Sequence, residues 1–112
     1  MKDQINPERN IYYELEGIIF IWDITKSERN EKKHSISFEE AATVITNPST
    51  RYFEDDDHSD DEERFIAIGF SRNMKFLTVC HCLRGVNKEI VRIISARKAT
   101  KQEEKVYDRG ED

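Results

Sequence analysis

The sequence predicts a single α+β domain, a small twisted antiparallel β-sheet packed with helices, in the order β-α-α-β-β-β-β-α. Three observations predict it. The chain has 112 residues, which is the size of one domain. Its second half contains apolar segments joined by short polar turns, as in an antiparallel meander. Two Ser/Thr-x-x-Glu patterns, beginning at Ser37 and Thr100, are capping boxes that mark helix starts.

The first strand and the first helix follow one another directly. Residues 18–22 form a short apolar run, which predicts a strand. Asp23 follows in N-cap position, and the polar residues 24–33 predict a helix that is exposed on most of its surface. Residues 1–17 are polar and contain Pro7. We expect them to form an irregular N-terminal extension before a domain of residues 18–112.

The remaining elements alternate between helix and strand signals. The capping box at Ser37 begins an Ala-rich helix through Ile45, which Asn47 and Pro48 end. Apolar or aromatic runs predict four further strands, at residues 51–53, 65–70, 76–83 and 89–95. The second capping box begins a final helix, which runs to about Tyr107.

The net charge of −5 is the sum of an acidic first half and a basic second half. Residues 1–63 have 7 basic and 17 acidic side chains, whereas residues 64–107 have 10 basic and 3 acidic ones. Eight of the carboxylates lie in the run 54–63, which favours a solvated loop, with a docking surface for a basic partner or a cation site as alternatives. The basic second half is compatible with a polyanionic partner.

The composition also limits where the protein acts. The longest apolar stretch, residues 17–22, is far shorter than the ~20 residues that span a membrane. No basic and then apolar leader opens the chain, and the two cysteines are too few for a disulfide scaffold. We therefore expect a cytoplasmic protein that does not contact a membrane.

Cys80, His81 and Cys82 lie within one predicted strand. Alternation puts the two cysteines on one face with Thr78, and His81 on the other face. Two thiolates do not complete a zinc site, so a metal site would need the distant His58, and buried cysteines are the simpler interpretation. His81 is either a hydrogen-bonded core histidine or an imidazole presented on a concave sheet.

Basic residues in the second half suggest an anion site. Arg92 interrupts an apolar strand, and a desolvated guanidinium requires either an anionic ligand or an internal ion pair. Arg97 is followed by Lys98 and Lys101, which together predict a basic corner suited to phosphate. Such a face could bind a polyanion. It could also cleave RNA without a metal or other cofactor, by acid–base transfer and stabilisation of the phosphorane charge.

Several separated motifs then resemble the BrnT family of toxins. They are Phe20-x-Trp22-Asp23-x-x-Lys26, Asn30-x-x-Lys33-His34, Phe38-Glu-Glu-Ala-Ala42, Asp57-His58-Ser59, Glu63-Arg64-Phe65, Ile68-Gly69, Arg92-Ile-Ile-Ser-Ala-Arg97-Lys-Ala-Thr100, Glu103 or Glu104, and Tyr107. They cover about residues 18–107 in the order of the family. The chain departs from it at Ser35, where the family usually has Gly, and at Cys82, where it usually has Thr.

The resemblance implies a RelE-like fold and a ribonuclease toxin of a type II toxin–antitoxin pair. Such a toxin cleaves RNA, inhibits translation and needs no cofactor. A BrnA-like antitoxin neutralises it in a hetero-oligomer and carries the contact with operator DNA, so the toxin meets that DNA only indirectly.

The resemblance also implies the site residues. As catalytic groups it gives His34, Arg64, Arg97 and Tyr107, with His34 as the acid or base and the two arginines on the scissile phosphate. Lys33 and Arg92 would bind RNA phosphate, together with Lys98 and Lys101 of the basic corner, and no metal takes part. Face geometry adds His81 as a second acid–base candidate.

One alternative comes from the acidic run. The chain could be a non-catalytic module that binds a basic DNA-binding partner through this loop and acts as a co-repressor.

Overall fold

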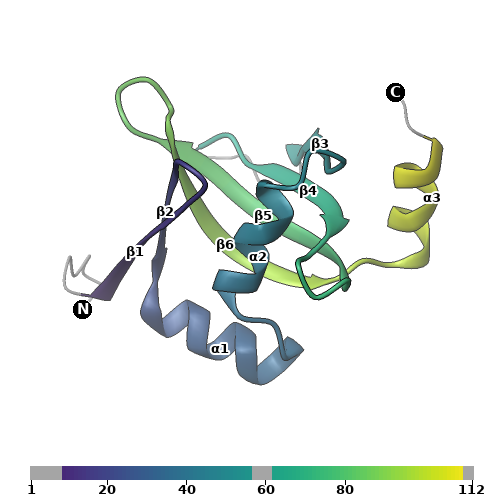
Figure 1. The fold of residues 1–112 in the computed structure, drawn as a ribbon, viewed down its shortest axis with the longest axis horizontal. Coiled ribbons are helices and arrows are strands. Elements are labelled where there is room, and N and C mark those ends of the chain that lie inside the picture. The colour runs from purple at the N-terminus through teal and green to yellow at the C-terminus, as the bar shows by residue number, and fades with distance from the viewer. Residues whose placement is uncertain (1–8, 57–61, 110–112) are drawn as a thin grey trace.

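The computed structural model describes residues 9–56 and 62–109. In these residues one mixed sheet of six strands packs with three helices (Figure 1). The strands lie in the order β1-β2-β6-β5-β4-β3. The elements are β1 (Asn10–Leu15), β2 (Ile18–Asp23), α1 (Ile24–His34), α2 (Phe38–Ile45), β3 (Arg51–Glu54), β4 (Phe65–Phe70), β5 (Phe76–Arg84), β6 (Ile90–Lys98) and α3 (Lys101–Arg109).

The core lies between the sheet and helices α1 and α2. Trp22 is its largest fully buried side chain, and its ring meets that of Phe38 edge-on at 5.8 Å. Around this pair pack Phe20, Ile36, Ala41, Ala42, Val44, Ala67, Leu77, Val79, Val91, Ile93 and Ala96. In the described part of the chain, the helices are too short and too polar to cross a membrane.

The predicted fold class and the element order from residue 18 onward are confirmed. Asp23 caps α1 by accepting a hydrogen bond from the Lys26 N–H at 2.9 Å. Ser37 caps α2 in the same way, through the Glu40 N–H at 3.0 Å. The carboxylate of Glu40 accepts from the Ser71 hydroxyl at 2.7 Å, and this contact fixes α2 to the β4–β5 turn.

The segment expected to be irregular contains a strand instead. β1 pairs antiparallel with β2 in the register Asn10↔Asp23 to Leu15↔Ile18, so the sheet extends into the predicted extension. Glu16 (φ 51°) and Gly17 (φ 83°) form the two-residue turn. Positive φ at both turn positions matches the twist of a hairpin, and Gly adopts it without strain. Alternate apolar residues of β1 pack on the core: Ile11, Tyr13 and Leu15.

One strand pairing differs from the expected antiparallel sheet. β2 lies beside β6 and runs parallel to it, with Ile19↔Ile90 and Ile21↔Arg92 as partners. The meander of β4, β5 and β6 is antiparallel as predicted. A parallel pair needs a long crossover, and the segment between β2 and β6 contains helices α1 and α2 and three strands.

Asn30 of α1 continues the pairing of β6 where β2 ends. Its side-chain amide donates to the Ala96 carbonyl at 2.8 Å and accepts from the Ala96 N–H at 3.1 Å. The same amide nitrogen donates to the Ile36 carbonyl at 3.0 Å, beyond the end of the helix. Asn30 is 7% exposed, so water cannot supply these hydrogen bonds to the backbone if the side chain is removed.

Helix α3 is attached mainly by its first residues and by one aromatic ring. The capping box is complete, because Thr100 Oγ1 accepts from the Glu103 N–H at 3.1 Å and Glu103 accepts from the Thr100 N–H at 2.8 Å. The ring of Tyr107 contacts that of Phe76 at 5.0 Å. No residue of α3 is buried, and in Figure 1 the helix stands at the edge of the molecule.

Replacing Asn30 by Ala should lower the free energy of unfolding by about 2–4 kcal/mol, because it leaves buried backbone groups of Ala96 and Ile36 without partners. Urea denaturation followed by circular dichroism measures the change. Glu28→Ala, at an exposed position of the same helix, should alter stability by less than about 0.5 kcal/mol. Equal stability losses in the two variants would contradict the role given to Asn30.

A second prediction concerns acid stability. Burial acts to raise the pKa of Glu103, but hydrogen bonds from Arg97, Thr100 and Thr78 outweigh it and hold this pKa at about 2, below its usual value of 4.5. The stabilisation is therefore present above pH 5 and lost as the pH falls from about 5 to 2, and amounts to at most about 3 kcal/mol. Urea midpoints at pH 7, 4 and 3 should fall less for Glu103→Gln than for the parent chain. Glu104→Gln, on the exposed side of α3, should keep the parent pH dependence.

Candidate functional site

The two faces of the sheet differ in cover and in charge. Val79 and Leu77 of β5 point toward α1 and α2, so their neighbours Thr78 and Cys80 point to the opposite face, here called the open face. By strand register the open face also carries several arginines. These are Arg51 of β3, Arg84 of β5, and Arg92 and Arg97 of β6.

A pocket of about 400 Å³ lies on this open face. It brings Arg64, which precedes β4, together with Arg97 of β6, although 33 positions separate them in the sequence. A register shift between β5 and β6 at Cys80/His81 lets both Ile94 and Ser95 line the pocket. The other lining residues are Asp55, Ile66, Thr78 and Cys80. Two guanidinium groups at one concave site form an arrangement suited to an anionic oxygen group.

Arg97 is held in place by α3. Its Nη1 and Nη2 groups donate to the two carboxylate oxygens of Glu103 at 2.9 and 2.8 Å. Nη1 also donates to the Lys98 carbonyl at 3.2 Å. Glu103 Oε1 accepts from the Thr78 hydroxyl at 2.8 Å as well, so strand β5 takes part in the same network. The hydrogen bonds to Glu103 raise the pKa of Arg97, which therefore stays charged.

Arg92 and Arg84 lie further along the same face. Arg92 is half-buried opposite Cys82 and Ile21, and among residues 9–56 and 62–109 no acidic side chain forms an ion pair with it. Arg84 has a different role. Its Nε and Nη2 groups donate to Glu62 at 2.5 and 2.9 Å, which lowers the pKa of that carboxyl group. This pair fixes the end of the acidic segment to the sheet.

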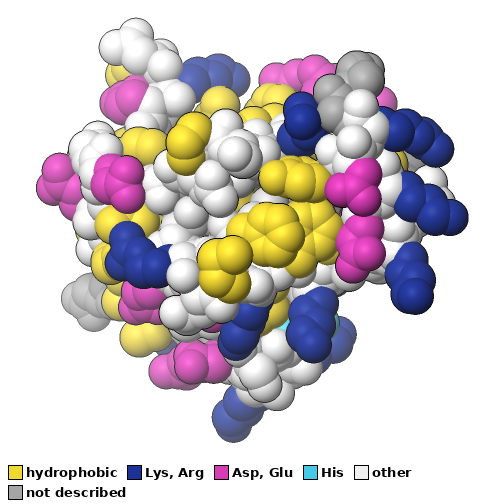
Figure 2. Space-filling model, turned by 45° about the vertical axis from the view of Figure 1, so that its right-hand side comes forward, with side chains coloured by type: hydrophobic (Ala, Val, Ile, Leu, Met, Phe, Trp, Pro, Cys, Tyr) yellow, Lys and Arg dark blue, Asp and Glu magenta, His cyan; other side chains and the backbone are white. Residues whose placement is uncertain are grey.

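Tyr107 belongs to an aromatic cluster at the end of the open face next to α3. Its ring lies edge-on to Phe70 at 6.3 Å and to Phe76 at 5.0 Å, and the Arg51 guanidinium lies 5.5 Å from its centroid. Arg51 Nε also donates to the Tyr107 carbonyl at 3.0 Å. Figure 2 brings this side forward and shows a central hydrophobic cluster bordered by Lys and Arg above and below and by Asp or Glu at its right.

His34 and Lys33 lie at the C-terminal end of α1, away from the pocket. His34 is one helical turn after Asn30, on the same side of the helix, which places it near the edge of β6. Ser35 ends the helix in the left-handed conformation, with φ 61°. Gly adopts this conformation without strain, which gives a physical reason for the Gly that the BrnT family usually has at this position. Lys33 is exposed.

The basic corner predicted after the last strand is divided. β6 extends through Lys98 instead of ending near Ser95, so Arg97 and Lys98 point to opposite faces. Lys98 shares the side of Leu77, on which the helices pack, and Lys101 begins α3 in an exposed position. The expectation that these three cations form one group is therefore wrong.

His81 is a core residue. It is 4% exposed on the helix-covered side, with the rings of Tyr52 and Phe65 at 6.0 and 5.9 Å. Burial lowers the pKa of His81, so the imidazole is neutral near pH 7. Of the two interpretations of His81 offered by the sequence, the structure has the core histidine.

The cysteines are free thiols. Cys80 lines the open-face pocket and Cys82 is buried. Burial is the main cause that raises the pKa of both. They remain protonated near pH 7, so neither is a ready nucleophile or metal ligand. The metal alternative with His58 falls outside the described residues.

Three contributors to the site were not predicted from the sequence: Arg51, Thr78 and the carboxylate of Glu103 as a partner of Arg97. The spacing Thr100-x-x-Glu103 predicts that Glu103 closes a capping box. Its contact with Arg97 depends on the direction that α3 takes after β6, which the spacing does not predict. Arg51 and Phe53 lie on the same face of β3, so Arg51 can be placed on the open face only once the sheet register is known. Thr78 offers no local signal.

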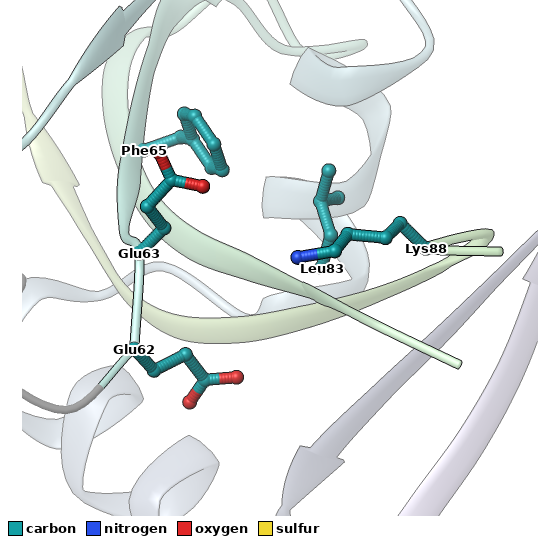
Figure 3. A pocket seen from close by; sticks show the side chains of 5 residues that line it. All are labelled: Glu62, Glu63, Phe65, Leu83 and Lys88. Atoms are coloured by element: carbon teal, nitrogen blue, oxygen red, sulfur yellow. The ribbon is translucent and has the colours of Figure 1, made fainter. Parts of the chain in front are cut away.

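A second pocket, of about 510 Å³, lies at the end of the acidic segment (Figure 3). Glu62 and Glu63 contribute carboxylates, Phe65 and Leu83 an apolar floor, and Lys88 a single cation. Figure 3 shows the Glu63 and Lys88 side chains reaching over the pocket from opposite sides. This mixture suits a basic side chain with an aliphatic stem better than it suits a phosphate.

Comparisons with known proteins identify the family to which the chain belongs. A search of curated proteins finds no match. A search of solved structures finds the crystal structure of the Brucella abortus ribonuclease toxin BrnT, with a TM-score of 0.55 and 26% sequence identity. The match covers 71% of this chain and 94% of the Brucella chain.

A family model described as ribonuclease toxin, BrnT, of type II toxin–antitoxin system matches residues 22–103. The match begins at the core residue Trp22 and ends at Glu103, the partner of Arg97. It therefore includes most of the helix-covered core, both pocket arginines and the start of α3. This chain belongs to the BrnT family of ribonuclease toxins of type II toxin–antitoxin systems.

Proposed function

We propose that this chain is itself an endoribonuclease, which cleaves RNA without a metal ion and inhibits translation until an antitoxin neutralises it. The observation that carries the proposal is the placement of Arg64 and Arg97 in one pocket on the open face. The family supports ribonuclease activity in general, and the pocket supplies a place for the scissile phosphate.

The two arginines would act on the phosphate. Cleavage of RNA by its own 2′-hydroxyl passes through a phosphorane with additional negative charge on the non-bridging oxygens. Guanidinium groups that are already in place stabilise that charge more than they stabilise the substrate, which is the requirement for catalysis. Arg92, on the same face, would bind an adjacent phosphate.

Proton transfer needs a base for the 2′-hydroxyl and an acid for the leaving 5′-oxygen. The 2′-oxygen forms a bond to phosphorus as the bond from phosphorus to the 5′-oxygen breaks, giving a 2′,3′-cyclic phosphate and a 5′-hydroxyl. His34 is our candidate for one proton transfer, because an imidazole can both accept and donate a proton. This role requires its ring, which does not line the pocket, to reach the bound RNA. Tyr107, on the pocket side of the molecule, would orient the substrate or take part in the second transfer. Lys33, Lys98 and Lys101 would add attraction for the RNA backbone.

The partners follow from the same proposal. A BrnA-like antitoxin would cover the open face in a hetero-oligomer and would provide the contact with operator DNA. The chain would act in the cytoplasm, and its expression without this partner should arrest cell growth.

Replacing Arg97 by Gln should lower kcat for RNA cleavage by about 10²-fold or more, because one preorganised donor to the phosphorane is lost. Arg64→Gln should have a similar effect. Cleavage by the parent chain should persist in EDTA, and the products should carry 2′,3′-cyclic phosphate ends, which mass spectrometry detects.

Arg109→Gln removes an equal charge from the exposed last turn of α3 and serves as the matched control. It should cleave RNA at the parent rate. Loss of cleavage in EDTA would contradict the metal-free reaction. Full activity of Arg97→Gln would contradict the assignment of the pocket.

A second candidate function rests on the pocket beside the acidic segment. The chain could act as a non-catalytic co-repressor that binds a basic DNA-binding partner through this segment. Glu62 and Glu63 at an apolar floor favour a basic, amphipathic side chain as the occupant. Residues 57–61 of the acidic run lie outside the described part.

The double variant Asp56→Asn/Glu63→Gln should weaken binding to a BrnA-like DNA-binding antitoxin by about tenfold, and the loss should shrink at high salt. Titration calorimetry at two salt concentrations measures it. Glu28→Gln/Glu31→Gln removes the same charge from exposed positions of α1 and should bind as the parent does. Equal losses in both double variants would mean that only total charge matters, and not the position of the acidic segment.

A further inference from the structure

Arg84 and Arg97 each pair with one glutamate, but they use different edges of the guanidinium group. Arg84 pairs through its side edge, with Nε and Nη2 both donating to Glu62. Arg97 pairs through its end, with Nη1 and Nη2 donating to Glu103. A guanidinium group has five N–H donors in a fixed planar fork, so the edge used for the carboxylate decides which donors remain.

The donors that remain on Arg97 form a second fork. Nη1 donates its two hydrogens to Glu103 and to the Lys98 carbonyl, and Nη2 donates one hydrogen to Glu103. Nε–H and the second Nη2–H have no hydrogen-bond partner within the described ranges. These two neighbouring hydrogens lie parallel on the side edge, which is the geometry that grips two oxygens of a phosphate. On Arg84 the same edge is occupied by Glu62.

Glu103 is rigid enough to orient that fork. Its Oε1 atom accepts from the Thr100 N–H and from the Thr78 hydroxyl, both at 2.8 Å, in addition to Arg97. One of these contacts comes from its own helix start and the other from strand β5. The Glu103 side chain is 19% exposed, which limits competition from water. The carboxylate therefore has a fixed position from which it holds the far end of Arg97.

We infer that Glu103 is the positioning residue of this site: it holds Arg97 by its end so that the side edge, Nε and Nη2, receives the phosphate of the RNA. The inference rests on the proposed function and names the atoms that carry it. Without the carboxylate, Arg97 can rotate about its flexible side chain, and the fork is no longer prepared before the substrate arrives. A displacement of about 1 Å in a catalytic group can cost about 10²-fold in rate.

The first test uses the unaltered chain. Arginine Nε–H resonances of ¹⁵N-labelled protein are followed while a short 2′-O-methyl RNA, which lacks the attacking hydroxyl, is added. The Nε–H resonance of Arg97 should shift in a saturable manner, and that of Arg84 should stay within the line width. Arg97→Lys and Arg84→Lys assign the two resonances. A shift of Arg84 without one of Arg97 would overturn the inference.

The second test separates positioning from stability. Glu103→Gln should lower kcat by about 10- to 100-fold, with KM changed less than threefold, at a temperature where the variant is fully folded by circular dichroism. In the Arg97→Lys background the same substitution should cause no further loss, because the fork is already absent. A purely structural role would give additive losses. Glu104→Gln should match the parent.

One result would reverse the interpretation. If Glu103→Gln bound the 2′-O-methyl RNA more tightly than the parent chain does, the carboxylate would be competing with phosphate and not preparing the site. The two proposals also fail separately. Absence of RNA cleavage by the parent chain would contradict the proposed function, whereas normal kcat in Glu103→Gln with an active parent would contradict only the role of Glu103.

Discussion

The pairing of the Asn30 amide with Ala96 is the interaction on which the arrangement of the site depends. β2 ends at Asp23, and beyond that point β6 would present unpaired backbone groups to the core. Asn30 supplies both a donor and an acceptor there, so α1 continues the edge of the sheet as a strand would. Arg97, the next residue of β6, is thereby fixed in direction, and His34 is fixed one helical turn further along α1. The buried Asn30 amide thus joins α1, which carries the candidate acid–base group His34, to β6, which carries the candidate phosphate ligand Arg97.

Much of the fold could be predicted because its signals are local. The N-caps at Asp23 and Ser37, the second capping box at Thr100 and the three apolar strands of the meander each follow from a few neighbouring residues, and the structure confirms them. β1 is not predicted, although Ile11, Tyr13 and Leu15 alternate along it as in a strand. Surrounding polar residues obscured that signal, and the strand is stabilised by pairing with β2. The parallel contact between β2 and β6 has no local signal at all.

The candidate site could be predicted only in part, and for the same reason. Arg64 and Arg97 were named from the resemblance to the BrnT family, and the fold brings them together. Lys98 is adjacent to Arg97 in the sequence, which suggests one basic group, but within a strand adjacent residues point to opposite faces. The contact of Glu103 with Arg97 depends on the direction in which α3 leaves the sheet. Local spacing predicted its helix cap and could not predict its second partner.

The parallel pairing of β2 with β6 also has a consequence for how the molecule is made. Ile19 and Ile90 are partners across 71 positions of sequence, so the sheet cannot close at its centre until almost the entire chain is available. Until then the β1–β2 hairpin has no neighbouring strand on its inner side, and an isolated hairpin is only marginally stable. Such long-range closure raises the contact order and slows folding. During synthesis the pocket therefore forms late. Arg64 is part of the growing chain well before the folded sheet places it beside Arg97.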